Sequence, residues 1–218
     1  MPSNFGGGER MNITEENSRH GTTTIGIVCT DGVILAADKR ASMGYMIASK
    51  TVEKIIMITD KIAMTTAGMV GDAQMLARYL KAEMELYEIR RQRVINVKAS
   101  ATLLGNILFG QRPYPFYVQL LLAGYDETGG HLYSLDPSGS VIGDKYTSTG
   151  SGSVFAYGVL DDQYKEGMNV AEGKLVILKA LKSAMARDIA TGDGMDLWVI
   201  NEKGITKLKK EEIAKILA

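Results

Sequence analysis

The hydrophobic pattern of this chain switches repeatedly between a strand period and a helix period, and the order of these switches constrains the fold. Runs of β-branched residues bounded by turn residues predict strands, and apolar residues at helical spacing predict helices. The predicted strands lie at 22–38, 54–66, 117–147 and 197–207, and the predicted helices begin near 72, 97, 152 and 170, with a short helix closing the chain. Turns such as Asp31-Gly32 join neighbouring strands into hairpins, which build antiparallel sheets. We expect an α+β domain, a four-layer αββα sandwich of two antiparallel sheets flanked by helix pairs.

The first 21 residues differ from the rest of the chain. They are polar and glycine-rich, and Phe5 and Ile13 are their only bulky aliphatic or aromatic residues. Such a segment buries too little apolar surface to order itself. We therefore expect a leader over 1–21 and one folded domain over 22–218, which is long enough to bury a sizeable core. Met1 and Met11 remain alternative start sites.

Composition argues against several classes of function. Lys and Arg total 25 and Asp and Glu total 25, so no overall charge draws the chain to nucleic acid or an anionic membrane. The single cysteine, Cys29, allows no internal disulfide and is expected to be a small buried hydrophobe. The two histidines, His20 and His131, offer little for a zinc site. No apolar run could span a bilayer or serve as a secretory signal, so we expect a soluble cytoplasmic protein without a cofactor.

Thr22 is the first candidate for chemistry. A threonine hydroxyl needs a nearby base to act as a nucleophile. If the chain is cut between Gly21 and Thr22, the new α-amine has an unperturbed pKa of about 7.7–8.0 and lies on the nucleophile's own residue. While Gly21 is attached, that nitrogen is an amide and takes no proton. The motif Gly-Thr-Thr-Thr alone is equally compatible with an ordinary strand start.

Two charged residues strengthen this interpretation. A hairpin folded at 31–32 brings Asp38 back toward Thr22, and Lys54 opens the following strand. A lysine near the α-amine would favour its deprotonation by like-charge repulsion, and Asp38 would keep that lysine charged. Each residue alone could be an exposed charge at a strand end.

Two glycine-rich junctions lie between a strand and a helix. In 67–72 the Gly68 N–H could stabilise an oxyanion and leave room for a substrate backbone, with Asp72 capping the helix. The second junction, 149–153, lacks the Gly-Lys-Ser/Thr ending of a phosphate-binding loop. Asp188 closes the fourth predicted helix, with Thr191 three residues later.

Together these motifs resemble archaeal-type proteasome β subunits, members of the N-terminal-nucleophile hydrolase family. The resemblance covers about 20–198 and is carried by motifs in a fixed order. These are Gly21-Thr-Thr-Thr-Ile-Gly, Ala37-Asp-Lys-Arg-Ala-Ser, Lys54, Thr66-Ala-Gly-Met-Val-Gly-Asp-Ala-Gln, Ser148-Thr-Gly-Ser-Gly-Ser and Arg187-Asp188.

The resemblance implies a threonine endopeptidase, activated when the chain cleaves itself between Gly21 and Thr22 and sheds 1–21 as a propeptide. Thr22 would be the nucleophile, tuned by Asp38 and Lys54, and the Gly68 N–H would form the oxyanion hole. Ser151 and Asp188 would support the Thr22 amine. Thr191 stands where the family often has serine, which retains the hydroxyl but adds a methyl group.

The resemblance also implies how substrate binds. An unfolded polypeptide would add as a strand against the backbone near Ser42 and Gly68. The pocket for the residue before the cut would be lined by Ala41, Val52, Ile56, Thr66 and Val70. These side chains are uncharged and mostly apolar, so we expect a preference for hydrophobic residues.

The implied assembly is a seven-membered homo-oligomeric β ring, stacked on a second β ring between rings of α subunits and fed by an ATP-dependent unfoldase.

Three alternative functions remain. The chain could be a catalytically silent ring subunit, although Thr22, Asp38 and Lys54 are all present. It could be a nucleotide-binding α/β protein, although hairpins argue against alternating βαβ units. It could also be the simpler bacterial relative that begins with Thr-Thr.

Overall fold

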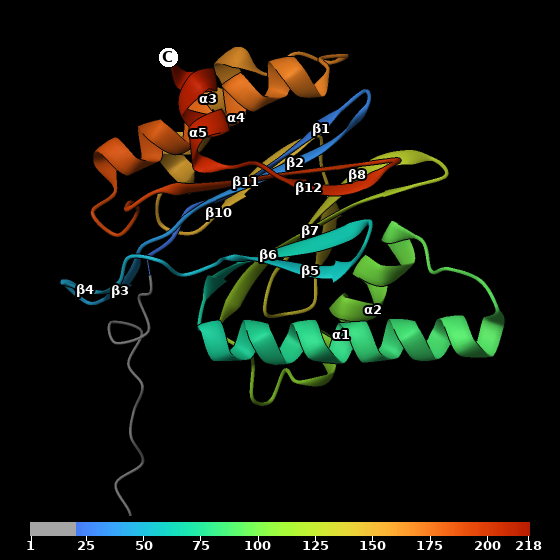
Figure 1. Cartoon of the computed structure of the whole chain (residues 1–218). Helices are drawn as coiled ribbons and strands as arrows, with labels where there is room; N and C mark the ends of the chain where they lie inside the picture. The colour runs from blue at the N-terminus through green and yellow to red at the C-terminus, as the bar shows by residue number, and fades with distance from the viewer. Residues whose placement is uncertain (1–20) are drawn as a thin grey trace, which may run out of the picture.

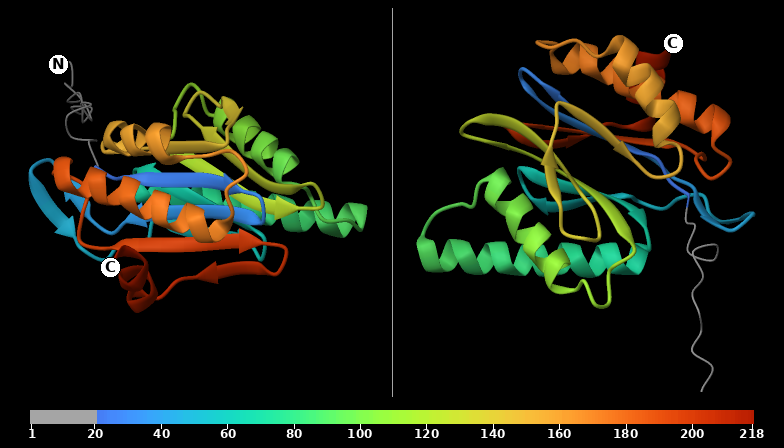
Figure 2. Two further views of the ribbon diagram at one scale, coloured as in Figure 1. Left: turned by 90° about the horizontal axis from the view of Figure 1, so that it is seen from above. Right: turned by 180° about the vertical axis from the view of Figure 1, so that it is seen from behind.

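The computed structural model describes residues 21–218 and shows four layers, in which helices cover the outer faces of two stacked sheets (Figure 1). Figure 2 shows the same layers from above and from behind. The predicted four-layer αββα sandwich is confirmed. Apart from Gly21, the predicted leader lies outside the described residues.

The first sheet has the strand order β10-β1-β2-β11-β12. Its neighbours all pair antiparallel, as the hairpins predict. The strands are β1 (Thr24–Cys29), β2 (Gly32–Asp38), β10 (Tyr146–Thr149), β11 (Met195–Asn201) and β12 (Gly204–Lys207).

The second sheet has the strand order β5-β6-β7-β8-β9 and is also antiparallel throughout. Its strands are β5 (Ile55–Thr59), β6 (Ile62–Gly68), β7 (Val118–Asp126), β8 (Gly129–Leu135) and β9 (Val141–Gly143). A separate hairpin of β3 (Ala41–Met43) and β4 (Met46–Ser49) projects from the body (Figure 1).

Helices α1 (Val70–Arg91) and α2 (Val97–Gly110) cover the second sheet, and α3 (Ser153–Gln163) and α4 (Val170–Arg187) cover the first. The short α5 (Lys210–Leu217) packs against α4 and β11. None of the helices described within 21–218 combines the length and apolarity that a membrane crossing requires.

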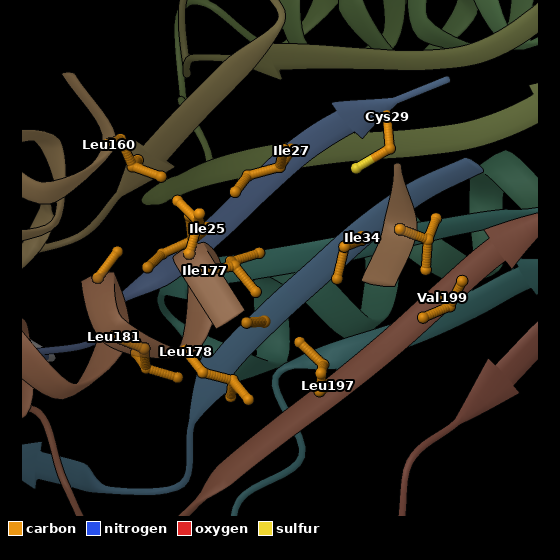
Figure 3. Packing of buried hydrophobic residues seen from close by; sticks show 14 of the residues in the cluster. Ile25, Ile27, Cys29, Ile34, Leu160, Ile177, Leu178, Leu181, Leu197 and Val199 are labelled. Atoms are coloured by element: carbon orange, nitrogen blue, oxygen red, sulfur yellow. The ribbon is translucent and has the colours of Figure 1, made fainter. Parts of the chain in front are cut away.

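Three hydrophobic layers hold the sandwich together. One lies between the first sheet and its helices and includes Ile25, Ile27 and Leu181 (Figure 3). A second lies between the other sheet and α1 and α2. The third lies between the sheets, where Leu35 of β2 meets Leu121 of β7. Because successive side chains of a strand point to opposite faces, the fully buried β2 contributes to both layers of its sheet.

Two predictions about elements were wrong, and one element was missed. The single strand expected to end near 147 is two strands, β9 and β10, and the chain crosses from one sheet to the other between them. The hairpin at 41–49 was not expected, because it is short, largely exposed and has an irregular register. The fourth helix ends at Arg187 rather than near 190, because Asp188 adopts an extended conformation.

Candidate active site

Thr22 lies immediately before β1, and the pairing of β1 determines its neighbours. Thr24 is opposite Ala37 of β2 on one side and Thr149 of β10 on the other. Because both neighbouring strands are antiparallel to β1, both end where β1 begins. Thr22, which is 5% exposed, is therefore flanked by the end of β2 and by the loop after β10.

Asp38, the last residue of β2, has no exposed surface, and its carboxylate accepts four hydrogen bonds. Oδ1 accepts from Lys54 Nζ at 2.7 Å and from the Thr23 N–H at 2.9 Å. Oδ2 accepts from the backbone N–H groups of Gly192 at 2.9 Å and Arg40 at 3.0 Å. This number of donors stabilises a buried negative charge.

Lys54 is 3% exposed and forms an ion pair with Asp38 between the two sheets. Burial lowers the pKa of the Lys54 ammonium, and the neighbouring Asp38 carboxylate opposes that shift. The main chain of Lys54 is anchored to β6, where its carbonyl accepts the Thr66 N–H at 3.0 Å. The same Asp38 oxygen thus connects the Lys54 amine with the peptide group that follows Thr22.

The loop after β10 reaches Thr22 from the other side. The Thr22 N–H donates to Ser151 Oγ at 3.3 Å, and Ser151 Oγ donates to Asp188 Oδ2 at 2.6 Å. Thr191 Oγ1 donates to the same Asp188 oxygen at 2.5 Å and lies 2.8 Å from Thr23 Oγ1. The structure therefore brings Ser151, Asp188 and Thr191 into one hydroxyl–carboxylate network beside the Thr22 nitrogen.

This loop depends on Gly150. Its φ is +91°, and a Cβ at this position would lie 2.1 Å from the Thr22 carbonyl oxygen. The Gly150 N–H donates to Gln119 Oε1 at 3.2 Å. Gln119 lies on β7 of the other sheet, so both sheets hold the Ser151 loop.

The Gly68 N–H faces the same side of β6 as the Lys54 main chain. In an antiparallel sheet, successive N–H groups of a strand point to opposite sides. Thr66 donates to Lys54, and Met69 donates at 2.9 Å to Tyr117, the residue directly before the neighbouring β7. The Gly68 N–H, two residues after Thr66, therefore points away from β7.

Gly68 requires a residue without a side chain, since a Cβ there would lie 2.2 Å from the Tyr117 carbonyl oxygen, and its φ is +110°. One expectation about this junction is corrected. Asp72 does not cap α1. Met69 is the N-cap residue and makes no side-chain cap bond, whereas Asp72 Oδ2 accepts the Tyr117 N–H at 2.9 Å.

Gly21 is closely packed ahead of Thr22. A Cβ on Gly21 would lie 1.7 Å from Ala190 Cβ, so no side chain fits without a shift of the chain. The Gly21 N–H donates to Ser42 Oγ at 3.1 Å. The residue before the predicted cleavage point therefore lies at Ser42, which was predicted to contact substrate.

Three of the five residues predicted to line the pocket meet on one cleft of about 370 Å3, namely Ile56, Thr66 and Val70. Ala41 and Val52 are not part of its lining. The hydroxyl of Thr66 is buried and has no hydrogen-bond partner within 21–218. The cleft is less neutral than expected, because its wall also carries Glu53, Arg78, Lys81 and Lys207.

Cys29 takes no part in this site. It packs in the layer between the first sheet and its helices. Burial, with smaller effects from Asp31 and Glu172, raises the pKa of its thiol to about 12. Since the thiolate is the nucleophilic form, Cys29 is unsuited to catalysis.

Sequence reasoning missed Tyr117 and Gln119, which contact the two glycine-rich junctions from β7. No local pattern marks them. Only the pairing of β6 with β7 could have indicated Tyr117, and only the stacking of the sheets could have indicated Gln119.

Comparison with known proteins gives consistent matches over most of the chain. A family profile described as "Proteasome subunit" matches residues 18–200. The chain is 53% identical to a Ferroglobus placidus protein over 90% of this chain and 94% of the relative. It is 52% identical to a Methanohalophilus mahii protein over 93% and 98%, and 50% identical to an Archaeoglobus fulgidus protein over 95% and 98%. All three relatives are named proteasome subunit beta.

Proposed function

The chain belongs to the proteasome subunit family, and on this premise we propose that it is the catalytic β subunit, a threonine endopeptidase whose nucleophile is Thr22. The observation that carries the proposal is the shared Asp38 oxygen, which accepts both Lys54 Nζ and the Thr23 N–H directly after Thr22. A buried lysine in this position supports control of protonation at the nucleophile.

In the proposed reaction, residues 1–21 have been removed and Thr22 carries a free α-amine. The Thr22 hydroxyl oxygen attacks the substrate carbonyl carbon, and its proton passes to the α-amine. The Gly68 N–H stabilises the oxyanion that forms. Collapse of this intermediate breaks the peptide bond, and the leaving amine takes the proton from the ammonium group. Water then hydrolyses the Thr22 ester and restores the enzyme.

The network around the amine supports this assignment. Lys54 carries positive charge close to the start of β1 and would lower the pKa of the Thr22 ammonium by like-charge repulsion. Ser151 Oγ, which already contacts the Thr22 nitrogen, would orient the free amine, and Asp188 would hold that hydroxyl in place. Asp38 would keep Lys54 charged and fixed.

The full chain would be a zymogen, with 1–21 as the propeptide and 22–218 as the hydrolase domain. In the uncut chain the Thr22 nitrogen is an amide and cannot act as a base. The tight contact of Gly21 with Ala190 and its bond to Ser42 support a Gly21 carbonyl presented to Thr22 in the manner of a substrate. Attack by the Thr22 hydroxyl on that carbonyl would transfer the propeptide acyl group from the Thr22 nitrogen, which takes up the hydroxyl proton, to the Thr22 oxygen. Water would then hydrolyse this ester and release the propeptide.

As a member of the family, the subunit would assemble into a proteasome complex. We propose stacked seven-membered β rings between α rings, supplied with unfolded polypeptide by an ATP-dependent unfoldase in the cytoplasm. Since every strand pair within 21–218 is antiparallel, the alternative of a βαβ nucleotide-binding protein loses its structural basis.

The proposal includes a substrate preference. Ile56, Thr66 and Val70 would surround the side chain before the cut, whereas Ala41 and Val52 lie outside the lining of this cleft. The cationic groups of Arg78, Lys81 and Lys207 on the same cleft would disfavour a basic side chain through like-charge repulsion.

The test uses the full chain assembled with a proteasome α subunit and fluorogenic peptides that end in Tyr, Leu or Arg. We expect wild type and Thr22→Ser to cleave after Tyr and Leu faster than after Arg, and Thr22→Ala to be inactive. Equal cleavage after Arg and Tyr would contradict the proposed pocket. Absence of cleavage by wild type would favour a silent ring subunit.

A further inference from the structure

The end of β6 passes into α1 with only Met69 between them. Met69 therefore serves both elements. Its N–H donates to the Tyr117 carbonyl at 2.9 Å, one residue beyond the paired ends of β6 and β7, and its carbonyl accepts the Ala73 N–H at 3.2 Å in the first turn of α1. The β6–β7 pairing thus ends where the helix begins.

This arrangement leaves Tyr117 without its ordinary acceptor. A hydrogen-bonded pair in an antiparallel ladder exchanges two bonds, so the Tyr117 N–H would normally donate to the Met69 carbonyl. That carbonyl is already used by α1. The Tyr117 N–H donates instead to Asp72 Oδ2 at 2.9 Å. The Asp72 carboxylate thus replaces the missing backbone acceptor and keeps β7 paired to the end of β6.

The position of Tyr117 determines the orientation of Gly68. A Cβ of Gly68 would lie 2.2 Å from the Tyr117 carbonyl oxygen, and the φ of Gly68 is +110°. By the alternation of N–H groups along a strand, the Gly68 N–H points to the side of β6 opposite β7, the side on which Thr66 donates to Lys54. A shift of Tyr117 would therefore rotate or release the Gly68 peptide group.

The start of β7 also supports the other side of the site. Gln119, two residues after Tyr117, accepts the Gly150 N–H, and Gly150 packs against the Thr22 carbonyl oxygen. The segment 117–119 at the start of β7 therefore contacts both Gly68 and the Gly150 loop beside Thr22, and it holds these two parts of the site relative to each other.

We propose that Asp72 is a positioning residue for peptide hydrolysis, which acts through Tyr117 to aim the Gly68 N–H at the developing oxyanion. This inference rests on the proposed threonine protease function. Asp72 touches neither Thr22 nor substrate in this account, and its effect should appear in kcat rather than in KM.

The test compares Asp72→Ala and Asp72→Asn with wild type, as full chains assembled with a proteasome α subunit. Rates are divided by the fraction of subunits that begin at Thr22, measured by intact mass. We expect Asp72→Ala to lower kcat by at least about 10-fold, with an upper limit set by the roughly 10²–10³-fold loss that follows removal of an oxyanion donor itself. KM should change little. Asp72→Asn should restore most of kcat, because its amide oxygen can still accept the Tyr117 N–H.

Asp126→Ala is the matched control. Asp126 Oδ2 accepts the Val97 N–H at 3.1 Å at the start of α2, and its Oδ1 accepts two bonds from Thr128, so its loss removes the same kind of bond, and more, from the same sheet. We expect it to lower the melting temperature at least as much as Asp72→Ala and to leave kcat unchanged.

The possible outcomes distinguish the positioning role of Asp72 from the proposed protease function. If Asp72→Ala retains the wild-type kcat, or if Asp126→Ala loses as much, Asp72 has no positioning role although the protease stands. If wild type itself cleaves no peptide, the proposed function fails and this inference fails with it. If Asp72→Ala keeps its leader while Asp126→Ala is cleaved normally, positioning is supported, because self-cleavage would use the same Gly68 N–H.

Discussion

Asp38 is the residue on which the geometry around Thr22 most depends. Its carboxylate binds four donors, and three of them are backbone N–H groups, of Thr23, Arg40 and Gly192. Loss of the fourth donor, Lys54, would leave these three hydrogen bonds in place, so the effect of Lys54 on catalysis can be measured separately from the geometry that Asp38 maintains.

Lys54→Ala should fold and assemble but lose turnover. We expect kcat to fall by about 10²-fold or more, which is the typical contribution of a residue that controls proton transfer. The melting temperature should fall only modestly, because three donors to Asp38 remain. Lys61→Ala, an exposed lysine at the other end of the same hairpin, is the control and should behave as wild type. Near-normal turnover of Lys54→Ala would remove Lys54 from the mechanism.

Cys29 should be inert toward thiol reagents. Its pKa is raised from 9.0 to about 12, so across this range the folded thiol keeps a proton that the unfolded thiol loses. The stability that this group contributes is complete below pH 9 and declines as pH rises toward 12. We expect iodoacetamide at pH 9 to alkylate Cys29 in denaturant but not in the native protein, as measured by intact mass. Equal rates in both states would refute the burial of this thiol.

The hairpin turn at Asp31-Gly32 is sufficient to predict that Asp38 returns to the start of β1, because the turn sets which residues of a hairpin lie opposite each other. The contacts from Gly192, Tyr117 and Gln119 are different. They join segments far apart in the chain, and their positions depend on strand pairing and sheet stacking that no local pattern encodes.

Among the elements, the loop between β10 and α3 carries the strictest backbone requirement. It must pass close to the Thr22 carbonyl while presenting Ser151 to the Thr22 nitrogen. Only a residue without a side chain fits at Gly150, where a positive φ and the near approach of Thr22 coincide.

Gly150→Ala should therefore displace the Ser151 loop. We expect a stability loss above about 1 kcal/mol, because alanine is strained at positive φ, and a kcat at least about 10-fold lower. Gly158→Ala, within α3 where no atom lies within 4 Å of the added Cβ, should instead stabilise the protein by about 0.5–1 kcal/mol. Thermal unfolding and peptide assays measure both effects. Unchanged kcat in Gly150→Ala would show that the loop tolerates displacement.

Helices and strands with a regular local sequence pattern were predicted, and those without one were missed. Hairpins with strong turns and long amphipathic helices were predicted because local spacing determines them. The β3–β4 hairpin was missed because its residues are mostly exposed and do not alternate. The split of one expected strand into β9 and β10 was missed because the two strands belong to different sheets, which the local sequence does not indicate.

For the molecule as a whole, the site exists only because the two sheets stack. Asp38 and the Ser151 loop adjoin the first sheet, whereas Lys54 and Gly68 belong to the second. The apolar layer between the sheets, with Leu35 and Leu121, sets how these groups face one another. The order of strands and helices predicted this sandwich, but not which residues would meet across it.

The most direct measurement is intact mass and N-terminal sequencing of the full chain after assembly with a proteasome α subunit, for wild type and Thr22→Ala. Self-cleavage by an N-terminal threonine predicts that wild type begins at Thr22 and that Thr22→Ala retains residues 1–21. A wild-type subunit that keeps its leader in the assembled complex would have no free Thr22 amine and would contradict the account.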